Sequence, residues 1–273
     1  MAGSGNSTLV IPIWSWRHVL HSAGKLIIWF CPILIMVTFW EFAARAHLIN
    51  ESVFPTFTAV SVAGYDLFQG GQIFLHLITS FYRAISGLAI GSIVGIALGM
   101  LMAYSRIVRD IVDPFVTLTF SLPKAAFIPI AFLWLGVGNA SIILVVFLST
   151  LVPMIISAYD GARSVNKQLI WSAQTMGASH LRMLTSIVFP ASLPYIFNGV
   201  RIGLAFSVVV VISAEMVAAY IGIGKFILLF GEGGNYNYMF AIVFVVIVVS
   251  FLLDQCFLLL SRRGLRWLDD NDV

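Results

Sequence analysis

Two charged side chains, Lys124 and Glu215, interrupt long apolar runs of this 273-residue sequence. A charge at the centre of a bilayer costs roughly 2.5–3.5 kcal/mol, so each would need a partner or a function if these runs cross a membrane. Lys124 lies between Pro123 and Pro129, where a helix would be broken. Its ammonium could face a water-filled cavity and attract an anion, or it could cap carbonyls freed by the break.

Glu215 follows Ser213 in a run of valine, isoleucine and alanine. These two residues could line a polar pathway or gate through the membrane. The carboxylate could instead pair structurally with Arg201, with Lys124 or with the backbone. Both interpretations fit a buried carboxylate.

Other chemistry-bearing patterns are absent from the sequence. It contains no His-Glu-x-x-His, no Gly-x-Ser-x-Gly and no paired intramembrane aspartates. The five histidines are dispersed, and Cys31 and Cys256 lie alone in apolar stretches. We therefore expect no catalytic residue, no metal site and no disulfide framework. The formal charge of +3 is too small and too scattered for a nucleic-acid-binding patch.

The composition dictates the elements that must position these residues. Hydrophobic residues make up 60% of the chain and charged residues only 10%, with a mean hydropathy of +1.00. Soluble domains carry about 25% charged residues, so the chain is expected to be an all-α membrane protein. Because roughly 20 apolar residues span a bilayer, there is room for six spans. The predicted spans are Leu26–Ala44, Ala84–Ala103, Phe115–Leu135, Ile142–Tyr159, Tyr195–Ile221 and Met239–Leu260.

The basic residues predict the orientation of these spans. With six spans, one side of the membrane receives most of the Lys and Arg residues, namely Arg17, Lys25, Arg106, Arg109, Arg163, Lys167, Arg182, Arg262, Arg263 and Arg266. The opposite side holds Arg45, Arg83 and Lys225. The positive-inside rule then places residues 1–25 and 261–273 in the cytoplasm, on either side of a membrane domain over residues 26–260.

The first span also resembles a cleavable signal peptide. Arg17 and Lys25 precede an apolar stretch that ends in Ala44-Arg45-Ala46. The stretch is long, and Glu41 interrupts the approach to the possible cleavage site. A retained first span is therefore the preferred interpretation.

The second span carries glycines at every fourth position: Gly87, Gly91, Gly95 and Gly99. At 3.6 residues per turn they form a nearly continuous groove on one helix face. Such a groove lets a second helix approach closely within lipid. We expect that helix to belong to the same subunit, with a dimer seam as the alternative.

The loop of about residues 160–190 contains a helix–glycine–helix pattern. Residues 169–179 predict a short helix that ends at Gly177, and Leu181, Leu184, Ile187 and Val188 recur at helical spacing. This element would present apolar and small residues in the cytoplasm. It could dock into a groove of a partner protein, or pack on the membrane surface.

This loop resembles the EAA loop of ABC-importer permeases. The resemblance rests on residues 173–177 and on residues 187–190, and it continues through Pro194 and residues 198–205. Further segments are similar to the nitrate/sulfonate/taurine branch of that family: residues 80–84, 122–130, 133–138, 214–215 and 263–267. The similarity covers the chain from about Phe54 to Trp267.

The resemblance implies a type I ABC-importer (MetI-like) permease fold in a bacterial inner or plasma membrane. It assigns the docking of the ATPase to a coupling helix made of Trp171, Ser172, Ala173, Met176, Gly177, Ala178 and Ser179. Pro190, Pro194 and Gly199 would form a hinge after it. Trp171 stands at the position where the family motif has an acidic residue. The tryptophan would therefore provide an aromatic contact to the ATPase in place of a possible ionic one.

The implied partners are a second copy of the permease, two cytoplasmic ATP-binding subunits and an extracytoplasmic substrate-binding protein. The chain has no Gly-x-x-x-x-Gly-Lys-Ser/Thr phosphate loop, so ATP and Mg²⁺ would be bound by the partner. The solute would be small and anionic, such as a sulfonate, taurine or nitrate. Relatives for aromatic acids or pyrimidine vitamin precursors are the alternative within the family. An ion-coupled secondary transporter is the alternative outside it.

Overall fold

The computed structural model describes residues 31–46 and 53–266. The chain divides into two compact units, residues 1–61 and 62–273. In the described part of the first unit, residues 31–45 are helical, as expected for the predicted first span. The start of that span, residues 26–30, and the predicted N-terminal segment 1–25 lie outside the described residues. Within this unit, Trp40 donates a hydrogen bond to the Pro55 carbonyl, and Glu41 accepts one from the Thr58 hydroxyl.

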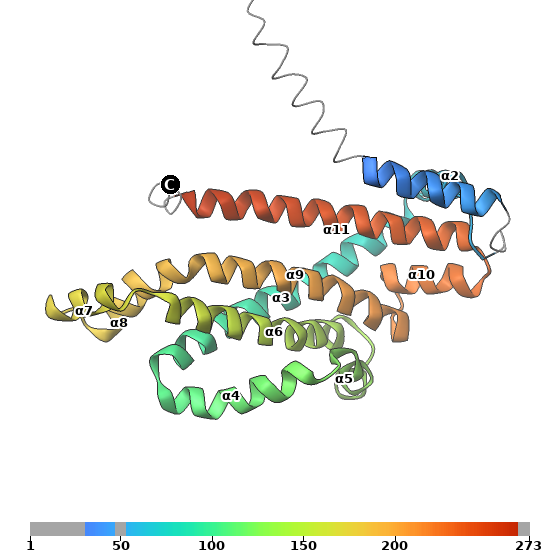
Figure 1. Ribbon diagram of the computed structural model, residues 1–273. Coiled ribbons are helices and arrows are strands. Elements are labelled where there is room, and N and C mark those ends of the chain that lie inside the picture. The colour runs from blue at the N-terminus through green and yellow to red at the C-terminus, as the bar shows by residue number, and fades with distance from the viewer. Residues whose placement is uncertain (1–30, 47–52, 267–273) are drawn as a thin grey trace, which may run out of the picture. The chain divides into compact units, whose positions relative to one another are not determined.

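All regular elements in the described part of the second unit are helices (Figure 1). Helix α2 (Phe57–Gln69) begins in the first unit and ends in the second. The helices that follow it are α3 (Gln72–Tyr104), α4 (Arg106–Ser121), the 3₁₀ turn η1 (Lys124–Ala126), α5 (Phe127–Leu135), α6 (Asn139–Ser164), α7 (Lys167–Thr175), α8 (His180–Met183), the π turn η2 (Leu184–Val188), α9 (Phe189–Ala218), α10 (Ile223–Glu232) and α11 (Tyr236–Gly264). The prediction of an all-α protein is therefore confirmed.

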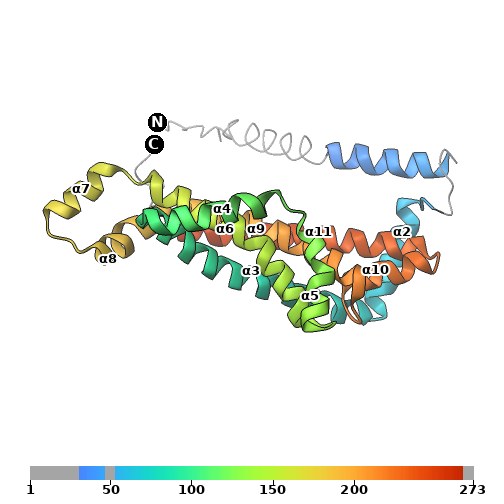
Figure 2. The same cartoon turned by 90° about the horizontal axis from the view of Figure 1, so that it is seen from below.

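The centre of this unit is formed by α3, α6 and α9, which pack against one another most extensively. One core cluster joins Ala84 of α3, Ile128 of α5, Val146 of α6 and Val211 of α9. Figure 2 shows α7 and α8 at one end of the bundle, and α5 and α10 at the other. The unit therefore has two distinct ends, which hold different functional residues.

Four helical stretches in the described residues are long and apolar enough to cross a membrane. They are α3, α6, the continuous stretch His180–Ala218 that ends in α9, and α11, and each contains most of one predicted span. The fifth predicted span was placed too far along the chain: its helix begins at His180 and ends at Ala218 rather than at Ile221.

The third predicted span, Phe115–Leu135, is broken in the structure. Its helix begins already at Arg106, and the two pieces 106–121 and 124–135 meet at a bend of 90°. Leu122 is extended (φ −78°, ψ 138°) because the ring of Pro123 disfavours a helical residue before it. Counted as one, the bent pair gives a fifth candidate span among the described residues.

Candidate functional site

The helix–glycine–helix element at one end of the bundle has well-defined caps. The Asn166 side chain accepts a hydrogen bond from the Gln168 amide at 2.9 Å and so begins α7. Gly177 has φ +77°, and the amides of Ala178 and Gly177 bond to the carbonyls of Ala173 and Gln174. This pair of bonds is a Schellman motif, in which glycine is favoured at the left-handed position.

The surface of this element is apolar and open. Trp171, Met176 and Leu181 are 62%, 87% and 71% exposed, whereas Ala173 is buried. Ser172, Gly177 and Ser179 are exposed as well, and Ala178 is half-buried. Of the seven predicted coupling residues, only Ala173 is therefore buried. Exposed apolar surface of this kind is typical of a docking site.

The predicted hinge residues lie in a continuous helix. From α8 the chain passes through η2 directly into α9, whose first turn contains Pro190. Pro194 lies one turn further on. Gly199 is a packing residue, since a Cβ atom there would come within 2.6 Å of Ser157 Cβ. The helix thus continues without a break through both prolines and this glycine, and the irregular turn is the π turn before them.

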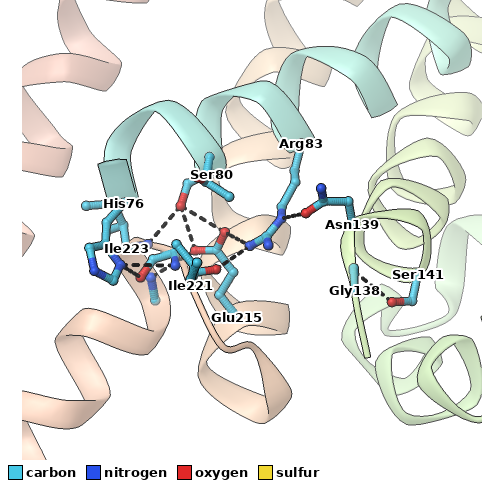
Figure 3. A network of polar contacts seen from close by, with 12 residues as sticks. His76, Ser80, Arg83, Gly138, Asn139, Ser141, Glu215, Ile221 and Ile223 are labelled. Carbon is cyan, nitrogen blue, oxygen red and sulfur yellow. Dashed lines mark hydrogen bonds and ion pairs between the residues drawn. The ribbon is translucent and has the colours of Figure 1, made fainter. Parts of the chain in front are cut away.

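A buried polar network occupies the opposite end of the bundle (Figure 3). Glu215 is fully buried, and its Oε1 lies 2.6 Å from Arg83 Nη1. The Ser80 hydroxyl lies 2.8 and 2.7 Å from the two carboxylate oxygens, and the Gly224 amide donates to Oε2 at 2.9 Å. Of the structural partners predicted for Glu215, the backbone is confirmed by the Gly224 amide, whereas Arg201 and Lys124 are wrong, and the charged partner is Arg83. Glu215 also lies one turn from the end of α9, not deep inside a span.

The network joins α3 to α6 and to the loop between α9 and α10. Arg83 also donates to Asn139 Oδ1 at 2.8 Å and to the Ile221 carbonyl at 2.7 Å. The Ile223 amide donates to the Ser80 hydroxyl at 2.8 Å. A Cβ atom at Gly222 would collide with the Glu215 carboxylate, so this loop passes directly over the acid. The network therefore fastens the loop to the bundle.

Sequence reasoning missed the α3 side of this network. Arg83 was assigned to the orientation of the spans and, together with Ser80, to a segment similar to the family, while His76 was counted among the dispersed histidines; none of the three was given a role in a polar network. His76 Nδ1 lies 2.9 Å from the Gly222 carbonyl, and its ring stacks on Phe226. The three residues follow one another at spacings of four and three, which places them on one helix face. That polar stripe in an apolar helix was the available signal.

A second ion pair joins α9 to α11. Arg201 Nε and Nη2 lie 2.8 and 2.9 Å from the two carboxylate oxygens of Asp254. Arg262, the basic residue two turns further along the same helix and the partner that local spacing would suggest, is therefore not the partner of Asp254. Two parallel bonds of this kind fix the relative orientation of both side chains.

Lys124 lies apart from Glu215, beside a pocket at the break between α4 and α5. The pocket has a volume of about 290 Å³, and residues of α6 and α9 complete its wall. It shares no residue with the network around Glu215. Ser213 lines neither of them among the described contacts, since its hydroxyl donates to the Val209 carbonyl of its own helix. Of the three residues predicted for a pathway, Ser213 and Glu215 are thus neighbours in α9 without a shared contact, and Lys124 lies apart from both.

The glycines of α3 face α6 within the same chain. A Cβ atom at Gly87 would lie 2.6 Å from Val146 Cβ, and one at Gly95 would lie 2.5 Å from Met154 Cβ. A Cβ atom at Gly91 would collide with the Thr150 hydroxyl, and one at Gly99 would lie 2.5 Å from the Ile155 carbonyl oxygen. The stripe therefore forms the contact between the two central helices.

No cluster of three or more potential metal ligands occurs among residues 31–46 and 53–266. The described residues offer an exposed apolar surface at one end of the bundle, a loop held by the network of Glu215 at the other, and a pocket beside Lys124 at the break between α4 and α5.

Comparison with known proteins agrees with this geometry. The sequence family described as "binding-protein-dependent transport system inner membrane component" matches residues 87–265. The taurine transport system permease protein of Escherichia coli (strain K12) is 31% identical over 262 residues, which cover 93% of both chains. The nitrate import permease protein of Synechocystis is 33% identical and covers 70% of this chain and 68% of its own.

Solved structures show the same fold. The inward-facing MetNI methionine ABC transporter has a chain with a TM-score of 0.64 at 17% identity, covering 71% of this chain and 96% of its own. A bacterial ABC transporter involved in alginate import gives a TM-score of 0.63 at 20% identity, covering 92% and 98%. The chain described here therefore belongs to the family of inner membrane components of binding-protein-dependent transport systems.

Proposed function

We propose that this chain is the permease subunit of an ATP-driven ABC importer, acting as a homodimer with two cytoplasmic ATP-binding subunits and an external substrate-binding protein. Family membership and the relatives that are named as taurine and nitrate permeases support this proposal. The observation that carries it is the capped, apolar element α7–Gly177–α8 that projects from one end of the bundle.

The element suits a partner that supplies energy. The sequence contains no phosphate loop of its own, so nucleotide hydrolysis would take place in the partner. Trp171 and Met176 would insert into a groove of the ATP-binding subunit, since large exposed side chains dominate such contacts. The Schellman motif holds the turn between them in one conformation. Docking is therefore apolar in character, without the acidic residue of the family motif.

The positions of the basic residues support an orientation with this element in the cytoplasm. Tyr104 at the end of α3 contacts His180, and Gly264 at the end of α11 lies near Phe197 of α9. The same end of the bundle thus gathers Arg106, Arg109, Arg163, Lys167, Arg182, Arg262 and Arg263. By the positive-inside rule this end is cytoplasmic, and both termini would lie there too.

Ion-coupled secondary transport has less support. A proton- or ion-carrying carboxylate must change its bonding during the cycle, and Glu215 is the buried candidate. Its two oxygens already accept bonds from Arg83, Ser80 and Gly224. Such a satisfied carboxylate is better suited to a structural role. Ion coupling also leaves the α7–Gly177–α8 element unexplained.

The proposal is tested by co-purification with candidate ATP-binding subunits. We expect Gly177→Trp to abolish association and transport, because it places a bulky side chain at a left-handed position of the docking turn. Gly234→Trp is the matched control. Gly234 also has a positive φ, and a Cβ atom there would meet no atom within 4 Å, but it lies at the other end of the bundle. If no ATPase associates with the wild type, or if Gly177→Trp transports normally, the proposal fails.

A further inference from the structure

Another pocket lies at the end of the bundle that holds the network of Glu215. It has a volume of about 240 Å³, and Arg83 of α3 lies on its wall. Asn139 in the first turn of α6 and Tyr220 in the loop between α9 and α10 line it as well. We refer to this space as the Arg83 pocket. It shares no lining residue with the pocket beside Lys124.

The buried Arg83 guanidinium has one nitrogen left for a ligand (Figure 3). The residue is only 5% exposed. Its Nε donates to Asn139, and its Nη1 donates to Glu215 and to the Ile221 carbonyl. Nη2 donates to none of the described residues, and it is not among their enclosed atoms that lack a partner. Its two N–H donors are therefore open to an acceptor in the pocket.

The beginning of α6 adds a second source of positive potential. This helix has 26 residues, and no side chain caps its N-terminus. The first amides of an uncapped helix have no partner within the helix, and the helix dipole places about half a positive charge there. Gly138 and Asn139, at this N-terminus, line the same pocket as Arg83. No acidic side chain lines it, so the pocket favours a carboxylate.

The exposed part of the lining is aromatic and apolar. Tyr220 is 83% exposed, and Val137 and Ile221 are exposed as well. Leu133 and Trp134, in the last turns of α5 before Val137, are also exposed. An arginine among exposed aromatic and apolar side chains is typical of the centre of a protein interface. The volume lies below the range of about 300–1,000 Å³ for small-molecule sites and suits a single side chain.

From this arrangement we infer that the Arg83 pocket receives an acidic side chain of the external substrate-binding protein. The inference rests on the proposed importer function and specifies how that partner docks. In the proposed orientation the other end of the bundle is cytoplasmic, so this end faces the binding protein. The carboxylate of an aspartate or glutamate accepts from Arg83 Nη2, and Tyr220 and Val137 contact the surrounding surface of the partner.

The test uses the full permease in complex with its ATP-binding subunits, in nanodiscs. Purified candidate substrate-binding proteins are screened against the wild-type complex by biolayer interferometry, and one that binds saturably becomes the probe. Asn139→Asp then places a fixed carboxylate in the pocket. We expect it to weaken binding of the probe by about 10-fold or more, because the new charge repels the incoming carboxylate and competes for Nη2 of Arg83.

The Asn139→Asp variant should fold and assemble. The aspartate keeps an oxygen that can accept the bond from Arg83 Nε, and an acidic residue is favourable in the first turn of a helix. Asn235→Asp is the matched control, since it adds the same charge at an exposed position in the turn between α10 and α11, outside the pocket. It should bind the probe as the wild type does. Tyr220→Ala, at a highly exposed position, should weaken binding by about fivefold or more.

Neutral variants of the binding protein test whether the ligand is a carboxylate. Each exposed aspartate or glutamate of the probe is changed to its amide, and every variant is titrated against the wild-type permease and against Asn139→Asp. For one position we expect weaker binding to the wild type. At that position the loss caused by Asn139→Asp should shrink to about twofold or less, because the repelled charge is gone.

The outcomes distinguish this inference from the proposed function. Equal binding by Asn139→Asp and the wild type overturns the Arg83 pocket as a docking site and leaves the importer intact. Equal weakening by Asn139→Asp and Asn235→Asp does the same. If no neutral variant of the probe reduces the effect of Asn139→Asp, the ligand is not an acidic side chain. Failure of every candidate to bind the assembled wild-type complex, in contrast, counts against the importer itself and removes the inference with it.

Discussion

The Arg83–Glu215 pair shows how two charges can be buried inside a helical bundle. Removing both charges from water is costly, and their attraction repays this only if the remaining polar atoms are satisfied. Here the carboxylate accepts bonds from a guanidinium, a hydroxyl and a backbone amide, and the guanidinium also binds Asn139 and Ile221. The pair therefore holds α3, α6 and the α9–α10 loop together.

This structural role predicts a large loss of stability when one partner is removed. Glu215→Ala leaves Arg83 buried without its counter-charge, which is expected to cost about 3–5 kcal/mol. The free energy of unfolding of the detergent-solubilised protein, followed by circular dichroism during denaturation, measures the effect. Glu232→Ala is the control, because Glu232 is exposed at the end of α10 and should change stability little. Equal stability of Glu215→Ala and the wild type would contradict the fastening role.

The need of Glu215 for a partner could be predicted from the sequence, but the identity of that partner could not. Arg83 is 132 residues away in the chain, and only the packing of α3 against α9 brings the two together. The same holds for Asp254. Arg262 lies on the same helix face two turns away, beyond bonding reach, whereas α9 places Arg201 directly opposite. Local spacing indicates which charges need partners, and tertiary packing selects them.

At the scale of helices, the glycine stripe of α3 determines how closely the central pair can pack. The sequence predicted the groove, and the facing helix proves to be α6 of the same chain. Thr150 of that helix sits against the glycines, with its hydroxyl bonded to the Val146 carbonyl. Close approach of this kind supplies the van der Waals contact that holds helices together in lipid.

Alanine substitutions in the stripe should therefore destabilise the protein despite better helix propensity. Alanine gains about 1 kcal/mol over glycine in a helix interior. At Gly95, however, its Cβ would lie 2.5 Å from Met154 Cβ and 3.0 Å from the Leu151 carbonyl oxygen, and such overpacking costs about 1–3 kcal/mol. We expect a net loss of up to about 2 kcal/mol in the free energy of unfolding. Gly138→Ala, at an extended position with open space, should be neutral; a stabilised Gly95→Ala would refute the close contact.

Hydropathy predicted the long helices well, but not the irregular ones. Pro123 and Pro129 marked the third span as weak, yet a 90° bend also depends on the packing of α5 against α6. The short helices α2 and α10 escaped prediction altogether, because each is too short to be recognised as a span. The pocket beside Lys124 follows from the bend. The sequence suggested a cavity near Lys124, but it did not predict which residues line the pocket.

At the scale of the whole second unit, one continuous helical stretch links its two ends. His180–Ala218 comprises 39 residues, or about 60 Å of helix at 1.5 Å per residue. It begins at the docking element, contributes Ile202 and Phe206 to the pocket, and ends beside the network of Glu215. A displacement of the α7–Gly177–α8 element could therefore be transmitted to the pocket along this one helical stretch. The π turn at Leu184–Val188 is the irregular point of this stretch, where a change of backbone conformation would be expected.

This arrangement requires that the two ends face opposite sides of the membrane, which cysteine labelling can test. In a Cys31→Ser/Cys256→Ser background, Asp110→Cys reports on the α3–α4 end and Asn235→Cys on the turn between α10 and α11. Both positions are exposed, and Asp110→Cys leaves the basic residues of its end in place. A membrane-impermeant maleimide should label Asn235→Cys in intact cells and Asp110→Cys only in inverted vesicles. Labelling of Asp110→Cys from outside would show that the orientation is the reverse of the proposed one. In that case a cytoplasmic ATPase could not contact α7 and α8, and the proposed energy coupling would have no basis.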